Sequence, residues 1–171
     1  IRELIKAVNE ISKSSTYRIK LLLIGLIDDN SRNTTIINDL IQSNKNIIYL
    51  GRFDDVRPYY LISDVHVHPS YREGFPNTVL EAGAMGLPSI ATDINGCNEI
   101  IKHNVNGFLI TPKSSIAIQE TMQTILTDPV ILDNLGKKAR ANVVEKYKRE
   151  LVWRALAEEY NTLLQKKRIS N

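Results

Sequence analysis

The sequence has one cysteine, few aromatic residues and no long apolar run, and each shortage excludes a class of protein. Cys97 is the single cysteine among 171 residues, so no disulfide can form within the chain. No apolar run approaches the ~18 residues of a membrane-spanning helix, and no basic and then apolar segment opens the sequence as a secretory signal would. A chain of this length buries roughly two-thirds of its unfolded surface, enough for a core without disulfides or metal. We expect one ordinary domain in the reducing cytoplasm.

Charge is distributed unevenly along the chain. Residues 1–135 hold 12 basic and 15 acidic side chains, whereas residues 136–171 hold 10 basic and 4 acidic ones. Aromatic residues make up 6% of the chain and nothing resembles a nucleic-acid-binding module, so we expect no nucleic-acid partner. The basic side chains are interpreted as a solvated helix face. The alternative is a weak contact with an anionic membrane surface, which would attach the protein peripherally to the inner face of the plasma membrane. These basic side chains are Lys137, Lys138, Arg140, Lys146, Lys148 and Arg149.

The first residues read as a helix already in progress. Ile1, Leu4, Ile5, Val8 and Ile11 fall on one stripe at spacings of three and four. The chain does not begin with Met, and no capping residue precedes the stripe. We therefore expect this sequence to be a fragment from which an upstream element is missing.

The rest of the chain alternates short apolar runs with helical patterns. Strands are predicted at 19–24, 47–50, 64–68, 89–92 and 107–110, and helices at 34–41, 56–62, 78–85, 98–102, 114–127, 132–144 and 149–164. This alternation predicts an α/β fold with a doubly wound, Rossmann-like parallel sheet. We expect residues 1–148 to form this domain, with 149–171 as a terminal helix and a frayed polar tail.

The segment from Glu73 to Glu81 lies where such a sheet binds ligands, directly after a strand. Gly74 permits close backbone approach, Pro76 stiffens the entry, and Asn77 can cap a helix whose first N–H groups then face an anion. Glu81 could accept both hydroxyls of a sugar diol, while Glu73 reaches another part of the same ligand. Taken singly, either acid could instead be solvated, with Glu81 merely placed near a helix dipole.

A longer motif that contains these residues indicates that they act in one binding site. The segment HPSYREGFPNTVLEAGAMGLPSIATDINGCNEIIKHNVNGFLI resembles the donor-binding half of retaining glycosyltransferase family 4, whose members have the GT-B architecture. The most specific part is the pair of glutamates separated by seven residues, followed by AGAMGLP and a strand that ends in Thr. The resemblance implies that this chain is the C-terminal, nucleotide-sugar-binding domain of a GT-B glycosyltransferase.

The resemblance also implies roles for individual residues. Glu81 would bind the ribose hydroxyls, and Glu73, the catalytic candidate, would contact the transferred sugar. The remaining expected donor contacts are Gly74, Phe75 and Asn77 at the sugar and phosphate, Thr78 and Val79 at the pyrophosphate, and Gly51, Arg52 and Phe53 at the base.

In such enzymes the reaction needs no protein nucleophile, because the leaving phosphate helps to deprotonate the incoming hydroxyl. The resemblance therefore implies no metal and no cofactor, with the nucleotide-sugar as substrate. In relatives an Arg and a Lys from a loop of this domain also contact the donor, and the resemblance implies that their counterparts would lie upstream of Ile1. An N-terminal domain of the relatives holds the acceptor and usually a catalytic His. We expect a bacterial parent enzyme of cell-surface polysaccharide synthesis, and a fragment with little or no transferase activity of its own.

Two departures from the family pattern leave the donor unidentified. Leu26-Ile27-Asp28-Asp29 stands where relatives often have a second glycine, and Gly96-Cys97-Asn98-Glu99 replaces a more usual double glycine. The alternative functions are a non-catalytic nucleotide or phospho-ligand module and a nucleotide-sugar epimerase. A dinucleotide-dependent oxidoreductase is disfavoured because no G-x-G-x-x-G follows a predicted strand.

Four further residues have ordinary interpretations beside functional ones. His66 and His68 alternate on one strand, a spacing that could hold a metal, but no acidic residue or cysteine stands at ligand spacing beside them, so a metal site is disfavoured. His68 could instead line the donor cleft. Cys97 lacks the paired His and acid of a nucleophile. Trp153 forms a stripe with neighbours on the last helix, which predicts either core packing or an interface with the missing domain. The other members are Leu151, Leu156 and Tyr160.

Overall fold

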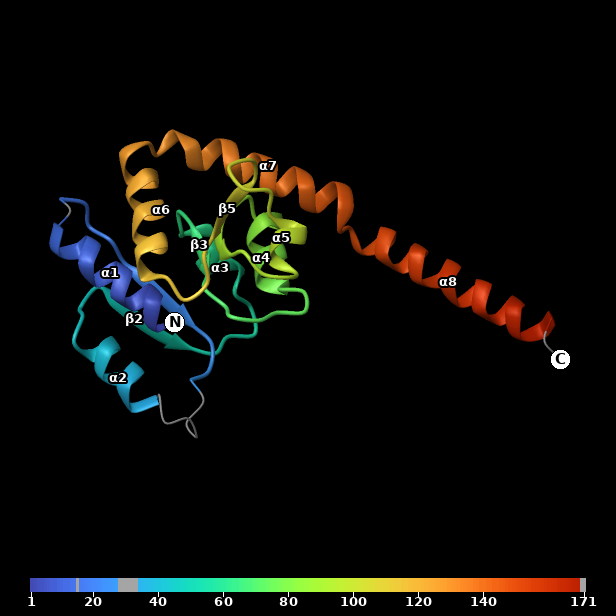
Figure 1. Cartoon of the computed structure of the whole chain (residues 1–171), viewed down its shortest axis with the longest axis horizontal. Helices are drawn as coiled ribbons and strands as arrows, with labels where there is room; N and C mark the ends of the chain where they lie inside the picture. Colours follow the sequence, from blue (N-terminus) through green and yellow to red (C-terminus); the bar gives the residue numbers. More distant parts are fainter. Residues whose placement is uncertain (15, 28–33, 170–171) are drawn as a thin grey trace.

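A computed structural model describes residues 1–14, 16–27 and 34–169 (Figure 1). The strands are β1 (Leu21–Ile24), β2 (Ile47–Gly51), β3 (His66–His68), β4 (Ser89–Thr92) and β5 (Gly107–Ile110). The helices are α1 (Arg2–Ser14), α2 (Thr34–Gln42), α3 (Arg57–Leu61), α4 (Asn77–Ala84), α5 (Cys97–Ile100), α6 (Ser115–Thr127), α7 (Val130–Lys146) and α8 (Arg149–Ile169). Every predicted element is present, with ends that differ by a few residues. Asp28 and Asp29, one of the two departures noted above, lie outside the described residues.

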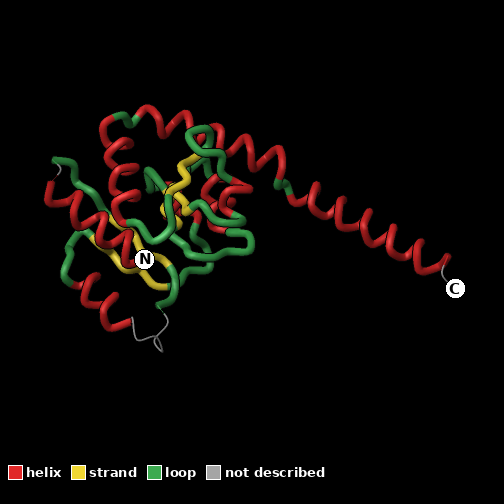
Figure 2. The backbone as a smooth tube through the Cα atoms, in the orientation of Figure 1, coloured by secondary structure: helices red, strands yellow, loops and turns green. Residues whose placement is uncertain are grey.

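The strands form two parallel sheets rather than the single sheet that the sequence predicts. β1 pairs with β2, and β3, β4 and β5 pair in that order, while β1 and β3 share no ladder within the described residues. Figure 2 shows both groups of strands between the helices. In a doubly wound sheet of order 3-2-1-4-5-6, these two groups correspond to the strands on either side of the central one.

Helices cover both faces of the β3-β4-β5 sheet, as the predicted doubly wound fold requires. Successive residues of β4 point to opposite faces, so Ile90 packs in a cluster with α1 and α6, whereas Ala91 packs with Val79 of α4 and Cys97 of α5. Ile90 and Ala91 are both fully buried. Burying a side chain such as Ile90 contributes about 1.5–3 kcal/mol.

Helix α1 joins the two sheets into one core. Leu4 and Val8 belong to the cluster that covers β4 and β5, and Ile5 packs with Leu23 of β1 and Ile47 of β2. Ile5 and Val8 are almost wholly buried, so the predicted stripe is confirmed for these positions. Ile1 is the exception, because its side chain remains 41% exposed.

Helix α7 supports α4 from behind. Gly136 of α7 lies directly against the carbonyl of Gly86, and a β-carbon on Gly83 would meet Val143 of α7 at 3.0 Å. The Arg140 guanidinium donates a hydrogen bond to the carbonyl of Ala84, at the last residue of α4. This packing fixes the C-terminal end of α4 and leaves its N-terminal end facing the loop after β3.

Helix α8 projects away from the rest of the molecule (Figure 1). Its described side chains, at positions 149–167, are all exposed, including Trp153 at 61%. The core-packing interpretation of the Trp153 stripe is therefore wrong, because no other element covers it within the described residues. The polar tail expected to fray from residue 165 continues α8 as far as Ile169. Within the described ranges, none of the helices combines the length and apolarity needed to cross a membrane.

Candidate functional site at the start of helix α4

Helix α4 begins at the end of the loop that follows β3, and Pro76 rather than Asn77 is its N-cap residue. The prediction that Asn77 caps the helix is wrong, since Asn77 is the first helical residue and Pro76 adopts the extended cap conformation (φ −79°, ψ 101°). The backbone N–H groups of Asn77 and Thr78 have no partner inside the helix. Both residues are exposed at the surface.

Val79 does not face this exposed end of α4. Its N–H donates to the carbonyl of Pro76 at 3.1 Å, and its side chain is 2% exposed in the core beside Ala91 and Cys97. The expected pyrophosphate contact from Val79 stays a prediction, and the structure shows the N–H of Val79 bonded to Pro76 and its side chain buried.

Glu73 is held at the mouth of the loop by His68, the last residue of β3. Nε2 of His68 lies 3.0 Å from Oε1 of Glu73, and Nδ1 lies 3.3 Å from the Thr78 hydroxyl. The side chains of His68 and Glu73 are 18% and 28% exposed. One imidazole thus connects the end of β3, the loop and the first turn of α4.

Glu81 is held by Tyr60 of α3. The Tyr60 hydroxyl lies 3.3 Å from Oε2 of Glu81 and 3.4 Å from the carbonyl oxygen of Thr78, close enough to donate to either. Burial, followed by the negative charge of Glu81, raises the pKa of Tyr60 well above its usual value, so this hydroxyl remains a donor. Glu73 and Glu81 are thereby both tied to Thr78, one through its side chain and the other at its backbone.

The loop expected at the base begins at the end of β2. Gly51 adopts a left-handed conformation (φ 77°) and its carbonyl accepts a hydrogen bond from the N–H of Gly25 at 2.8 Å. The ring of Phe53 lies 4.8 Å from that of Tyr59, the neighbour of Tyr60 on α3. Arg52 and Phe53 are exposed. Helix α3 therefore links the Gly51–Phe53 loop to the side chain that holds Glu81.

Gly74 and Phe75 are exposed residues of the loop before α4. The ring of Phe75 lies 5.6 Å from that of Tyr147, which follows α7. The Tyr147 hydroxyl in turn donates to the carbonyl of Glu99 at 3.0 Å. The Phe75 side chain thus connects the loop to the residue that follows α7.

The remaining candidates have structural explanations. Burial lowers the pKa of His66 to about 3, with His68 adding to the effect, and its Nδ1 lies 3.0 Å from the Ser89 hydroxyl. Burial, and then the charges of Glu73 and Asp93, raises the pKa of Cys97 to about 11, which disfavours the nucleophilic thiolate. In the part of the chain that the structure describes, no three His, Cys, Asp or Glu side chains are grouped as a metal site would require.

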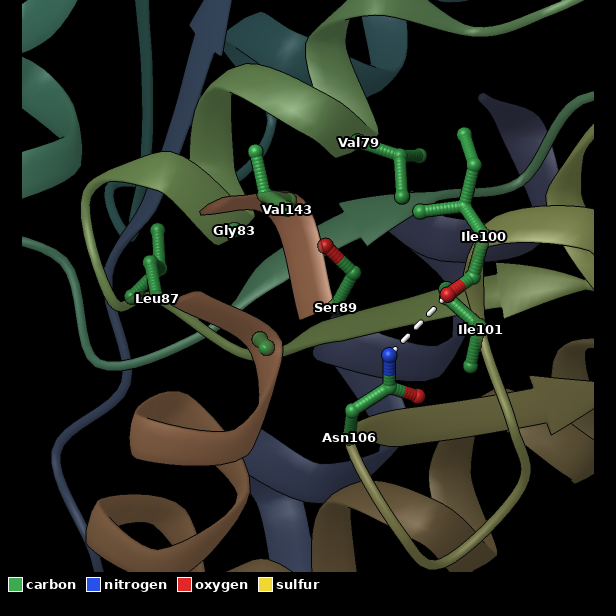
Figure 3. Close-up of a pocket in the computed structure, with 9 residues that line it drawn as sticks. Val79, Gly83, Leu87, Ser89, Ile100, Ile101, Asn106 and Val143 are labelled. Carbon is green, nitrogen blue, oxygen red and sulfur yellow. Dashed lines mark hydrogen bonds between the residues drawn. The ribbon is translucent and has the colours of Figure 1, made fainter. Parts of the chain in front are cut away.

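A small internal hollow lies behind α4 rather than at its start (Figure 3). Its volume of about 10 Å³ is close to that of a single water-sized sphere. Its walls are mostly apolar, and its amide group is satisfied, because Asn106 donates to the carbonyl of Ile100 at 2.9 Å (Figure 3). This hollow is a packing defect, and the candidate site is instead an open surface around the N-terminal end of α4.

Tyr60 is a site residue that sequence analysis did not single out. It stands 21 positions before Glu81 in a five-residue helix. No helical or strand spacing relates the two residues, so only the packing of α3 beside α4 brings them together.

Comparison with known proteins places this chain in a family. The model of the family described as Glycosyl transferases group 1 matches residues 1–142. The capsular polysaccharide biosynthesis glycosyltransferase CapM of Staphylococcus aureus is 31% identical over 165 residues, covering 96% of this chain and 43% of CapM. The N-acetyl-alpha-D-glucosaminyl L-malate synthase of Bacillus anthracis is 30% identical over 135 residues, covering 78% of this chain and 35% of the synthase. This chain spans less than half the length of both relatives.

Solved structures share the fold. Anabaena HepE in complex with UDP-glucose superimposes with a TM-score of 0.86 at 22% identity, covering 94% of this chain and 44% of HepE. The C-terminal domain of the glycosyl transferase LpcC from Francisella tularensis superimposes with a TM-score of 0.76 at 29% identity, covering 86% of this chain and 78% of that domain. The chain therefore belongs to the group 1 glycosyl transferases, with the Rossmann-like fold of a GT-B C-terminal domain.

Proposed function

We propose that this chain binds the nucleotide-sugar donor of a retaining glycosyltransferase that moves a sugar to a hydroxyl acceptor. One observation carries the proposal: Glu73, through His68, and Glu81, through Tyr60, are both linked to Thr78 in the first turn of α4. Carboxylates accept hydrogen bonds from sugar hydroxyls, and a helix start donates to phosphate. A nucleotide-sugar carries both kinds of group, with its diphosphate between the sugar and the ribose.

Each part of the donor then has a place. Glu81 accepts from the ribose hydroxyls while Tyr60 donates to one of its oxygens, so the carboxylate keeps free lone pairs for a diol. The diphosphate lies at the N–H groups of Asn77 and Thr78, where the helix dipole contributes about 0.3–1 kcal/mol for an exposed anion. Glu73 and the backbone of Gly74 and Phe75 face the transferred sugar.

The base is proposed to lie at the loop formed by Gly51, Arg52 and Phe53. This loop is connected to Glu81 through the contacts of α3, so a nucleoside can span from one to the other. The Phe53 ring is 39% exposed and offers an apolar face to a base.

In the proposed reaction the acceptor hydroxyl attacks the sugar carbon on the face that the diphosphate leaves. The bond between sugar and phosphate oxygen breaks, the new glycosidic bond forms, and the acceptor proton passes to the departing phosphate. This chain orients the donor and stabilises the negative charge that grows on the diphosphate through the start of α4. Neither a protein nucleophile nor a metal or cofactor enters this mechanism, so a chelator should leave donor binding unchanged.

The parent protein is proposed to supply the acceptor site in a separate N-terminal domain. The 43% share of CapM that this chain covers supports a longer parent, and the exposed apolar stripe of α8 supports a partner on that helix. Within the described residues β1 pairs only with β2 and β3 only with β4, which supports a further strand between β1 and β3. By analogy with CapM, we place the parent in cell-surface polysaccharide synthesis, acting in the cytoplasm at the inner face of the membrane.

Calorimetric titration of this chain tests the proposal. The ligands are UDP, GDP, UDP-glucose and GDP-glucose, and the variants are Glu81→Ala and Glu120→Ala, an exposed acid on α6 that serves as the matched control. We expect at least one nucleotide-sugar to bind, Glu81→Ala to weaken binding at least tenfold, and Glu120→Ala to leave it unchanged. Binding of unrelated phosphates without dependence on Glu81 would instead favour the phospho-ligand module.

A further inference from the structure

Three aromatic side chains stand in a row behind the two glutamates. The ring of Tyr60 meets that of His66 edge to face, with centroids 5.9 Å apart, and the rings of His66 and His68 are also 5.9 Å apart. His66 is the middle member, and burial keeps it neutral by lowering its pKa to about 3. Tyr60 and His68 therefore both pack against the uncharged ring of His66. The Tyr60 hydroxyl lies next to Glu81, and Nε2 of His68 lies next to Glu73.

The hydrogen bonds of His68 define which nitrogen carries the proton. The Glu73 carboxylate can only accept, so Nε2 of His68 must donate to it across 3.0 Å. In the neutral ring Nδ1 is then an acceptor, and the Thr78 hydroxyl donates to it across 3.3 Å. With both nitrogens engaged, the imidazole has one orientation, and that orientation sets the position of the Glu73 carboxylate.

Tyr60 holds Glu81 by an independent contact. Its hydroxyl carries one proton, which is shared between Oε2 of Glu81 at 3.3 Å and the Thr78 carbonyl at 3.4 Å. Glu81 is otherwise an exposed side chain on the first turns of α4 with many rotamers available. The Tyr60 contact restricts those rotamers before any ligand arrives.

We propose that His68 and Tyr60 are positioning residues that divide the donor between them: His68 sets Glu73 for the sugar, and Tyr60 sets Glu81 for the nucleotide. This inference rests on the proposed function. Its specific content is that sugar recognition and nucleotide recognition can be weakened separately, through two residues that touch neither part of the donor.

Titration of this chain with UDP and with UDP-glucose distinguishes the role of the His68–Glu73 contact from that of the Tyr60–Glu81 contact. We expect His68→Leu to weaken UDP-glucose binding about tenfold and to change UDP binding less than twofold. His68→Gln keeps an N–H donor close to the position of Nε2, so it should recover most of the UDP-glucose affinity. Tyr60→Phe removes only the hydroxyl and should weaken both ligands by the same factor.

A double-mutant cycle distinguishes positioning from a general structural effect. In a Glu73→Ala background the carboxylate that His68 positions is absent, so His68→Leu should cause no further loss of UDP-glucose affinity. If His68→Leu lowers affinity by the same factor in both backgrounds, the positioning role is wrong. Thermal unfolding of each variant shows whether a loss arises from unfolding instead.

A spectroscopic measurement does not depend on binding at all. The ¹⁵N resonances of the His68 ring in the unliganded chain should show a proton on Nε2, and Glu73→Gln should alter that pattern because an amide can also donate. A ring that carries a proton on Nδ1 and none on Nε2 in the unmodified chain overturns the inference.

The outcomes also separate this inference from the proposed function. If the unmodified chain binds neither UDP nor UDP-glucose, the proposed function fails for uridine donors and the inference fails with it. If the unmodified chain binds UDP-glucose no better than UDP, or if His68→Leu weakens binding of both ligands equally, the proposed division of roles between His68 and Tyr60 is wrong. The proposal that the chain binds a nucleotide is then unaffected.

Discussion

The backbone of Gly96 packs directly against the carbonyl oxygen of Gly74. A β-carbon at position 96 would overlap that oxygen and would stand 3.0 Å from Cδ of Pro76. Gly96 is also left-handed, with φ 82°, and it is the N-cap residue of α5. A side chain at residue 96 would therefore displace the loop that carries Glu73.

We predict that Gly96→Ala displaces the loop from Glu73 to Pro76 and weakens binding of UDP-glucose several-fold. Gly86→Ala is the matched control, because Gly86 has a similar φ of 75° but no atom within 4 Å of the added β-carbon. Both variants should lose about 1 kcal/mol of stability from the left-handed backbone alone. Only Gly96→Ala should also bind UDP-glucose more weakly than the unmodified chain.

Denaturant unfolding and calorimetry of the two variants check this prediction. Equal affinity in both variants would show that the Gly74 contact does not position the loop.

His66 should make stability depend on pH. Its pKa in the folded chain is about 3, against 6.5 for the unperturbed residue, so the unfolded state binds an additional proton between these values. The free energy of unfolding therefore contains a contribution that is complete above pH 6.5 and is lost as the pH falls toward 3. The slope from this residue is at most about 1.4 kcal/mol per pH unit.

The comparison that isolates His66 is the variant His66→Gln, which retains a polar partner for the Ser89 hydroxyl. Urea unfolding between pH 7 and pH 4.5 should give a shallower pH slope for the variant than for the unmodified chain. Other titrating groups contribute equally to both proteins. Parallel slopes would mean that His66 is protonated in the folded state and is not protected by burial.

Close packing of α7 on the turn after α4 reverses the usual effect of replacing a helical glycine. Alanine normally stabilises the interior of a helix by about 0.5–1 kcal/mol relative to glycine. At Gly136 the new β-carbon would overlap the carbonyl of Gly86 and lie 3.4 Å from Cδ of Pro88. We predict that Gly136→Ala destabilises the chain by about 1–3 kcal/mol, as overpacking does. Thermal unfolding measures the change, and a raised melting temperature would contradict it.

Local patterns predicted the elements well because each carries its own signal. The alternation of Ile90 and Ala91 between two faces, and the spacing of Leu4, Ile5 and Val8, follow directly from strand and helix geometry. The separation of β1 from β3 has no such local signal. It depends on which strands lie side by side, and hydrophobic periodicity does not determine that.

The candidate site was only partly predictable for the same reason. Glu73 and Glu81 stand out through their spacing within a recognisable motif, whereas Tyr60 reaches Glu81 only through tertiary packing. The error at Asn77 is one position: the helix begins there, so Pro76 occupies the cap and Val79 turns into the core. A shift of one residue rotates a helical side chain by about 100°, which decides whether it meets ligand or protein.

Helix α8 should contribute almost nothing to the stability of the remainder of the chain. Its described side chains are all exposed, and isolated helices are marginal in water. We predict that removing residues 149–171 changes the free energy of unfolding by less than about 0.5 kcal/mol, as surface changes do. Trp153 is the single tryptophan, so its fluorescence reports on α8 alone. In urea, its emission should therefore fail to follow the cooperative loss of circular dichroism from the domain. Coincident transitions, or a large loss of stability on truncation, would show that α8 packs against residues 1–148 in solution.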